Sequence, residues 1–150
     1  MLNLADNKQG FYDYQILEEF EAGLVLSGAE VKSAKLGHIS LNGSFVSIKD
    51  GQAILKKMHI SSYKKAKMSQ KDYQPERERE LLLKKKEIDY LLGKTKEKAL
   101  TIIPISVYTT RRLVKVKIAL AKGKKKFDKR QALKNRDVSR EIARKLKTLY

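Results

Sequence analysis

Three acidic side chains that lie close together near the start of the chain, Glu18, Glu19 and Glu21, are the first candidates for chemistry. Paired carboxylates can act as general acid and base, and carboxylate oxygens are ligands that Mg²⁺ accepts. No nucleophile or second group of metal-binding residues accompanies them. The alternative is that they are solvated charges at the end of a strand, and we favour that interpretation.

The other residue types form no catalytic or metal-binding pattern. The chain has no Cys and only two histidines, His38 and His59, which excludes a Cys–His pair, a thiolate metal site and a disulfide, and fits a reducing compartment. Glycine-rich nucleotide loops and the nucleophilic serine motif are missing. His59 alternates with apolar neighbours, which is typical of packing. We therefore expect no enzyme, no metal site and no cofactor.

Positive charge is the strongest signal in the sequence. The 150 residues include 34 Lys and Arg against 17 Asp and Glu, a net charge of +17. Residues 1–63 hold six basic and seven acidic residues, 64–120 hold sixteen and seven, and 121–150 hold twelve and three. Such an excess indicates a polyanionic partner, which could be RNA, DNA or an acidic membrane surface. No run approaches the roughly 18 apolar residues that span a bilayer, and no signal peptide is apparent, so we expect a cytoplasmic protein.

Alternating apolar residues predict the elements that must position these charges. Strands are expected at 13–17 and 23–28, in a hairpin over 44–55 that turns at Asp50-Gly51, at 57–63, and in a second hairpin formed by 100–108 and 113–120. In the last strand Lys115 and Lys117 alternate with apolar residues, so one face is buried and the other is basic. Pro104 cannot donate a ladder hydrogen bond and is expected at an edge or a bulge.

Two helices are predicted between the strands, at 29–37 with Gly37 as its C-cap and at 75–94 starting near Pro75. Together the elements predict a mainly β protein, a small closed barrel of about six strands with two to three flanking helices over residues 1–120. Residues 121–150 form a basic C-terminal tail. Its apolar residues from Val138 onward recur at helical spacing but are few, so we expect a tail that is disordered in isolation and helical against a polyanion.

Aromatic residues beside basic ones suggest base stacking next to phosphate neutralisation. Tyr12 and Phe127 are the better stacking candidates, whereas Tyr14 and Tyr63 are expected to be half-buried strand residues.

Three longer stretches form recognisable motifs. They are "EAG-x-x-L-x-G-x-E-V-K-S" from Glu21 to Ser33, "P-x-R-x-R-x-LLL" at 75–83 and "LAKGKKKFDKR" at 120–130. Together they resemble the SmpB (small protein B) family of bacterial tmRNA-binding proteins. Their order and spacing agree with the family over essentially the whole chain. The resemblance implies that the barrel is OB-fold-like. It also implies a protein that binds the tRNA-like domain of tmRNA (SsrA RNA) and delivers it to ribosomes stalled without a stop codon, where the tail probes the empty mRNA channel.

The resemblance also implies the partners and the site residues. The partners are tmRNA and the stalled 70S ribosome, with alanyl-tRNA synthetase and elongation factor Tu acting functionally; no membrane or DNA partner is expected. The tmRNA contacts fall on Asn7, Glu21, Leu82 and Lys115. The residues implied at the decoding centre and in the mRNA channel are Tyr12, Lys124, Lys125, Lys126, Phe127, Asp128, Lys129, Arg130, Arg140 and Arg144.

The chemistry expected of these residues differs. Lys115 can meet phosphate. Glu21 cannot, and would accept hydrogen bonds from base N–H or 2′-OH groups, or hold nearby cations. Leu82 is either an apolar contact or a packing residue. Two other classes stay open: a structural RNA-binding protein such as a ribosomal protein with a basic tail, and an RNA-modifying or hydrolytic enzyme, for which no catalytic group is found.

Overall fold

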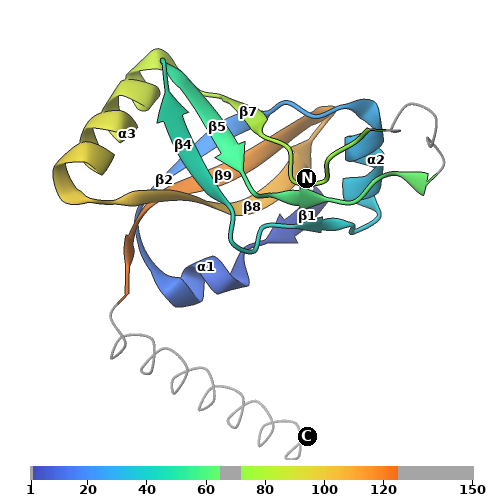
Figure 1. The fold of residues 1–150 in the computed structure, drawn as a ribbon, viewed down its shortest axis with the longest axis horizontal. Coiled ribbons are helices and arrows are strands. Elements are labelled where there is room, and N and C mark those ends of the chain that lie inside the picture. The colour runs from blue at the N-terminus through green and yellow to red at the C-terminus, as the bar shows by residue number, and fades with distance from the viewer. Residues whose placement is uncertain (1, 65–71, 125–150) are drawn as a thin grey trace, which may run out of the picture.

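The centre of the molecule is a closed ring of six antiparallel strands. In this computed structural model, which describes residues 2–64 and 72–124, the strands follow the order β8, β4, β5, β7, β2, β9, and the ring closes because β9 pairs again with β8 (Figure 1). They are β2 (Tyr14–Leu24), β4 (Phe45–Lys49), β5 (Gln52–Lys56), β7 (Arg79–Leu82), β8 (Thr101–Thr110) and β9 (Leu113–Gly123). The prediction of a closed, mainly β barrel of about six strands is confirmed.

Smaller elements surround the ring. Strand β1 (Leu2–Asp6) pairs with the outer edge of β8, and β3 (Ile39–Ser40) pairs with β6 (His59–Ile60) in a separate two-stranded sheet. The helices are α1 (Lys8–Asp13), α2 (Gly28–Lys35) and α3 (Lys85–Lys98). Figure 1 shows α3 and α2 at opposite ends of the barrel and α1 below it, beside the point where β9 ends.

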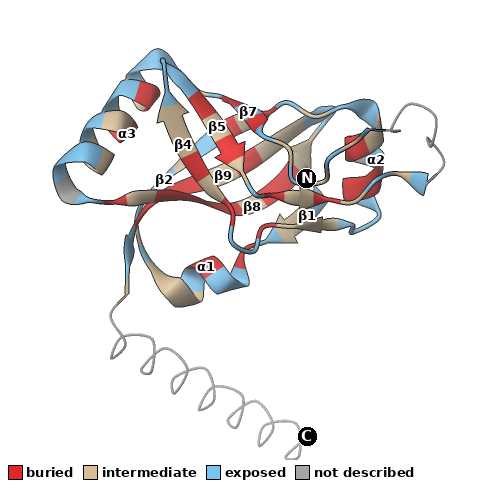
Figure 2. Ribbon diagram, in the orientation of Figure 1, coloured by how far each residue is buried: buried red, intermediate tan, exposed pale blue. Residues whose placement is uncertain are grey.

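The core fills the inside of the ring. Along β9, Val116, Ile118 and Leu120 are at most 2% exposed, whereas Lys115 and Lys117 between them reach the surface. Figure 2 shows this buried layer along β5, β8 and β9. Full burial of one such aliphatic side chain contributes about 1.5–3 kcal/mol, so the alternation drives closure of the barrel. The predicted division of the last strand into a buried and a basic face is confirmed.

Local sequence signals position the turns as expected. Asp50 and Gly51 adopt φ values of 53° and 74° between β4 and β5, as a tight hairpin requires. The register of β8 against β9 shifts between Pro104 and Ser106, so Pro104 lies at a bulge. The predicted helix at 29–37 is α2, and Gly37, with φ 87°, follows its end.

The predicted helix at 75–94 is wrong over its first half. Residues 79–82 form β7, in which Arg79 and Leu81 point inward and Glu80 and Leu82 point outward, and α3 begins only at Lys85. The inward–outward alternation has the two-residue period of a strand. The three consecutive leucines at 81–83 fit both the two-residue period of a strand and the 3.6-residue period of a helix, which explains the wrong assignment.

Three further boundaries differ from the prediction. The expected strands at 13–17 and 23–28 are replaced by a single strand, β2, whose acidic middle pairs with β9. Residues 25–27 lie beyond this strand, and Gly28 already belongs to α2. Strand β1 and helix α1 were not predicted. The extended piece expected at 57–63 contains only the two residues of β6.

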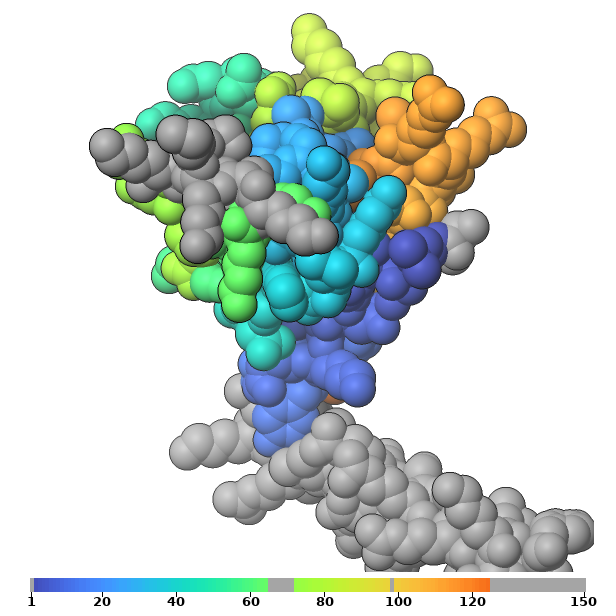
Figure 3. Space-filling model, turned by 90° about the vertical axis from the view of Figure 1, so that its right-hand side faces the viewer, coloured from blue at the N-terminus to red at the C-terminus, as the bar shows by residue number. Residues whose placement is uncertain are grey.

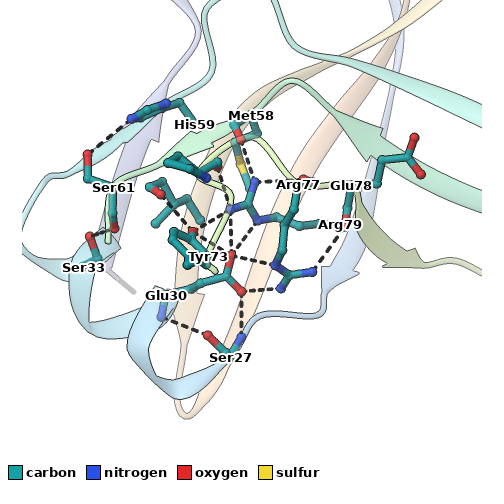
Figure 4. Close-up of polar contacts among 12 residues, drawn as sticks. Ser27, Glu30, Ser33, Met58, His59, Ser61, Tyr73, Arg77, Glu78 and Arg79 are labelled. Atoms are coloured by element: carbon teal, nitrogen blue, oxygen red, sulfur yellow. Dashed lines mark hydrogen bonds and ion pairs between the residues drawn. The ribbon is translucent and has the colours of Figure 1, made fainter. Parts of the chain in front are cut away.

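A buried charge cluster attaches α2 to the barrel (Figure 4). The side chains of Glu30 and Arg79 are both 0% exposed, and Arg79 Nε donates to Glu30 Oε2 at 2.8 Å. Arg77 donates to the same carboxylate from its Nε and Nη2. The single hydroxyl proton of Tyr73 has two acceptors within reach, the carbonyl of Ile60 at 2.8 Å and Glu30 Oε2 at 3.1 Å.

Every donor nitrogen of Arg79 has a partner inside this cluster. Its Nη1 donates to the carbonyls of Met58 and Arg77, and its Nη2 donates to Tyr73 Oη and the carbonyl of Pro75. Burial alone would raise the pKa of Glu30, but hydrogen bonds from Arg77, the Ser27 N–H and Arg79 outweigh it and lower that pKa to about 2. Glu30 from the first family-like stretch and both arginines of the second therefore hold the fold together.

Candidate nucleic-acid interface

Three of the four residues expected to contact tmRNA meet at one point of the barrel wall. Gly23 of β2 lies opposite Leu82 of β7 on one side and opposite Lys115 of β9 on the other. Glu21 lies two residues before Gly23 and therefore faces the same way. We call Glu21, Gly23, Leu82 and Lys115 the Gly23 junction.

Gly23 allows Leu82 to lie against β2. A Cβ atom at this position would stand 3.2 Å from Leu82 Cβ, which is tighter than ordinary contact. Leu82 itself is 57% exposed on the outer face of β7. It is therefore not a core residue, and its contact with tmRNA stays a prediction.

Glu21 and Lys115 form an ion pair at the surface. Lys115 Nζ donates to Glu21 Oε1 at 2.8 Å, with the two side chains 30% and 51% exposed respectively. The other carboxylate oxygen accepts a hydrogen bond from Tyr108 Oη. The hydrogen bond from Lys115, followed by that from Tyr108, lowers the pKa of Glu21, while burial and Glu21 raise the pKa of Tyr108 to about 12. Glu21 is thus held as a carboxylate whose remaining lone pairs face solvent.

An apolar groove of about 300 Å³ continues from the junction. Exposed Val25 and Leu113 line it together with Leu82, and Arg112 and Lys115 place positive charge at its side. Figure 3 looks toward this end of the barrel, where the segment after β2 lies beside the yellow-green region of β7 and the orange β8–β9 turn. Apolar surface next to cationic groups suits an unstacked base beside its phosphate.

Asn7 lies apart from the junction and serves the fold. It is 3% exposed, its Oδ1 accepts from the Gly10 N–H at 2.9 Å as the N-cap of α1, and its Nδ2 donates to the carbonyl of Pro104 at 2.8 Å. Because the amide is engaged inside the protein, an effect of Asn7 on RNA would act through α1. Its contact with tmRNA stays a prediction.

The start of the expected tail is fixed to α1. Gly123, the last residue of β9, pairs with Tyr14, and Lys124 donates from its N–H to the carbonyl of Asp13 and from Nζ to that of Phe11, both at 2.9 Å. Half-buried Tyr12 lies between these acceptors in the chain. The structure therefore brings two expected ribosome-facing residues, Tyr12 and Lys124, to one place. The others lie outside the described residues: Lys125, Lys126, Phe127, Asp128, Lys129, Arg130, Arg140 and Arg144.

The acidic cluster does not converge on a common point. Glu18 accepts from Tyr90 Oη at 2.6 Å, Glu19 lies 3.8 Å from Lys117 Nζ, and Glu21 belongs to the junction. Within residues 2–64 and 72–124, no three His, Cys, Asp or Glu side chains are grouped so that they could hold a metal ion. Their separate partners agree with the interpretation of these acids as surface charges. Their expected place at a strand end is wrong, because all three lie within β2 and pair with β9.

Tyr108, Val25, Arg112 and Leu113 belong to this surface and were not singled out from the sequence. Tyr108 lies directly opposite Lys115 in the β8–β9 ladder, close to the turn that joins the two strands. The signal in the sequence was the TTRR turn with aromatic and apolar residues on either side.

Among the described residues, no helix is both long and apolar enough to cross a bilayer.

The fold and the Gly23 junction together define a small β-barrel protein with a surface of the kind that contacts RNA. Comparison with known proteins gives the family. The family model for "SmpB protein" matches residues 4–148, and the chain belongs to the SmpB family.

Several relatives share most of the chain. The "SsrA-binding protein" of Sulfurihydrogenibium sp. (strain YO3AOP1) is 51% identical over 144 residues, which cover 96% of this chain and 93% of that protein. The "SsrA-binding protein" of Coprothermobacter proteolyticus is 49% identical over 148 residues, 98% of each chain. A solved structure described as "tmRNA-SmpB: a journey to the center of the bacterial ribosome" matches with a TM-score of 0.67 and 39% identity over 86% of this chain and 93% of that one.

Proposed function

We propose that this protein binds the tRNA-like domain of tmRNA and delivers it to ribosomes stalled on messages without a stop codon. The observation that carries the proposal is the Gly23 junction, which presents a fixed carboxylate, a lysine and an exposed leucine on one face. SmpB family membership and the names of the relatives, which bind SsrA RNA, support tmRNA as the ligand. The protein works by binding alone, without a catalytic step, in the cytoplasm.

The proposal gives the two parts of the chain different tasks. The barrel, residues 1–120 with the rest of β9, holds tmRNA through the junction. The basic tail from 121 onward enters the empty mRNA channel of the 70S ribosome and becomes helical there. The attachment of Lys124 to α1 supports a shared orientation for Tyr12 and the tail. Alanyl-tRNA synthetase and elongation factor Tu act on the tmRNA complex.

The junction predicts a specific binding defect. Lys115→Met should weaken tmRNA binding by about ten-fold and reduce the slope of log affinity against log salt by about one, because a phosphate contact is lost. Leu82→Ala should weaken binding by about three- to ten-fold without changing that slope, since only an apolar contact is removed. Filter binding or fluorescence anisotropy over a salt series measures both.

Lys49→Met is the matched control. Lys49 is an exposed lysine at the β4–β5 turn, across the ring from the junction, and its loss removes the same charge. We expect it to change tmRNA affinity by less than about two-fold. Equal losses for Lys49→Met and Lys115→Met would show that binding depends on net charge and not on the junction.

A further inference from the structure

Tyr108 is buried, but its hydroxyl also contacts the Gly23 junction, which burial alone does not explain. The residue is 6% exposed in the wall of the barrel, yet its hydroxyl reaches the surface and donates to Glu21 Oε2. Lys115 donates to the other oxygen, Oε1, at 2.8 Å. Each oxygen of one exposed carboxylate thus has its own donor, and the two donors come from β8 and β9.

The two donors constrain Glu21 to different degrees. A lysine side chain has four rotatable bonds and retains much of its freedom at the surface. The Tyr108 ring is packed in the barrel wall, so its hydroxyl is a fixed point. Without that hydroxyl, Glu21 would keep its charge partner but would be free to rotate around it. Tyr108 therefore determines the orientation of the carboxylate.

An oriented carboxylate recognises hydrogen-bond donors. A carboxylate has about four acceptor positions, of which two are occupied here, and the side chain is 51% exposed. RNA offers suitable donors in its 2′-hydroxyls and in the N–H groups of unpaired base edges, whereas phosphate has none and is repelled. Lys115 keeps N–H groups for a neighbouring phosphate.

We propose that Tyr108 is a positioning residue that fixes Glu21 for recognition of a hydrogen-bond donor on RNA, and that this contact favours tmRNA over other folded RNAs. The inference rests on the proposed function, since it assumes that the Gly23 junction faces tmRNA. In this proposal the lysines provide affinity for RNA, and Tyr108 together with Glu21 provides selectivity for tmRNA.

The test compares Tyr108→Phe with Tyr90→Phe. Both remove a tyrosine hydroxyl that donates to a glutamate on β2, but the partner of Tyr90 is Glu18, outside the junction. We expect Tyr108→Phe to weaken binding to the tRNA-like domain of tmRNA by about three- to ten-fold, the range for one typical hydrogen bond, and to leave binding to an unrelated tRNA unchanged. Tyr90→Phe should change neither by more than about two-fold.

A pH series separates positioning from a merely structural role. Lys115 and Tyr108 lower the pKa of Glu21, with a smaller effect from Lys117, whose own partner is Glu19. Selectivity for tmRNA should therefore disappear as pH falls through that lowered pKa. Loss of the Tyr108 hydroxyl raises the pKa of Glu21, so the variant should lose its selectivity at higher pH than the wild type.

A double-mutant cycle with Glu21→Gln decides the proposal. The double variant should bind tmRNA no more weakly than Glu21→Gln alone, because Tyr108 acts through Glu21. Additive losses, or unchanged tmRNA binding and pH dependence in Tyr108→Phe, would overturn the inference. If thermal melting shows that Tyr108→Phe does not fold, Glu21→Gln alone still tests it, since retained selectivity would contradict the proposal. A wild type without preference for tmRNA would instead refute the proposed function.

Discussion

Alanine in place of Glu30 is expected to lower the free energy of unfolding by about 3–5 kcal/mol, the cost of leaving a buried charge without its partner. The side chains of Glu30 and Arg79 are both 0% exposed, so the variant leaves the Arg79 charge buried without its carboxylate. Tyr73 and Arg77 lose the same acceptor. Domains of this size have only about 5–15 kcal/mol of stability, so the variant should melt far below the wild type. Urea unfolding followed by circular dichroism measures the change.

The matched control for this prediction is Glu78→Ala. Glu78 lies 3.6 Å from Lys56 at the surface, where its side chain is 66% exposed, and such pairs contribute at most about 1 kcal/mol. If the two variants lose similar stability, the buried cluster does not hold α2 to the barrel as described.

Acid gives a second readout of the Glu30 variant. The pKa of Glu30 is lowered from 4.5 to about 2, so ionised Glu30 stabilises the folded state relative to the unfolded state. This contribution is complete above pH 4.5 and is lost as pH falls toward about 2. The difference in stability between the wild type and Glu30→Ala should therefore narrow across that interval. A constant difference would mean that Glu30 acts through packing alone.

Ending the chain after Lys124 is expected to abolish peptide tagging on stalled ribosomes while tmRNA binding persists within about three-fold at physiological salt. Residues 125–150 hold ten basic and three acidic residues, and the proposed function gives them the mRNA channel. The Gly23 junction and all of β9 remain in the shortened protein. Tagging in a reconstituted translation reaction on a message without a stop codon, together with tmRNA binding, measures both effects.

The place of the truncation matters because β9 continues to Gly123. Ala121, Lys122 and Gly123 pair with Ile16, Gln15 and Tyr14, so a chain ended at Leu120 also loses part of the barrel. That shorter variant serves as the control and should lose stability as well as tagging. Normal tagging by the chain that ends after Lys124 would remove the proposed role of the tail.

The barrel could be predicted because its strands follow simple local rules. The Asp50-Gly51 turn and the alternation around Ile118 each report a strand or turn within a few residues. The assignment failed at 75–83, where a four-residue strand runs directly into a helix and the leucines satisfy both periods. Nothing local indicated that Arg79 would be buried, since its partner Glu30 is 49 residues away in the chain.

The candidate site was predictable only in part, because its residues also lie far apart in the chain. The family resemblance gave the four expected tmRNA contacts, and the structure brings three of them together at the Gly23 junction. It places Asn7 in the cap of α1 instead. Tyr108 lies opposite Lys115 near the β8–β9 turn, but its partner Glu21 is 87 residues away in the chain. The pairing of β2 with β9 that brings these residues together cannot be obtained from a local pattern.

A salt titration of the wild-type protein with the tRNA-like domain of tmRNA and with an unrelated tRNA tests the central claim most directly. Both affinities should fall as salt rises from about 50 to 200 mM, because lysine–phosphate contacts release counterions. The account predicts that tmRNA stays at least about ten-fold more tightly bound across the series, since the Glu21 and Leu82 contacts depend little on salt. Two curves that coincide at every salt concentration would contradict it and would leave only a basic protein that binds any folded RNA.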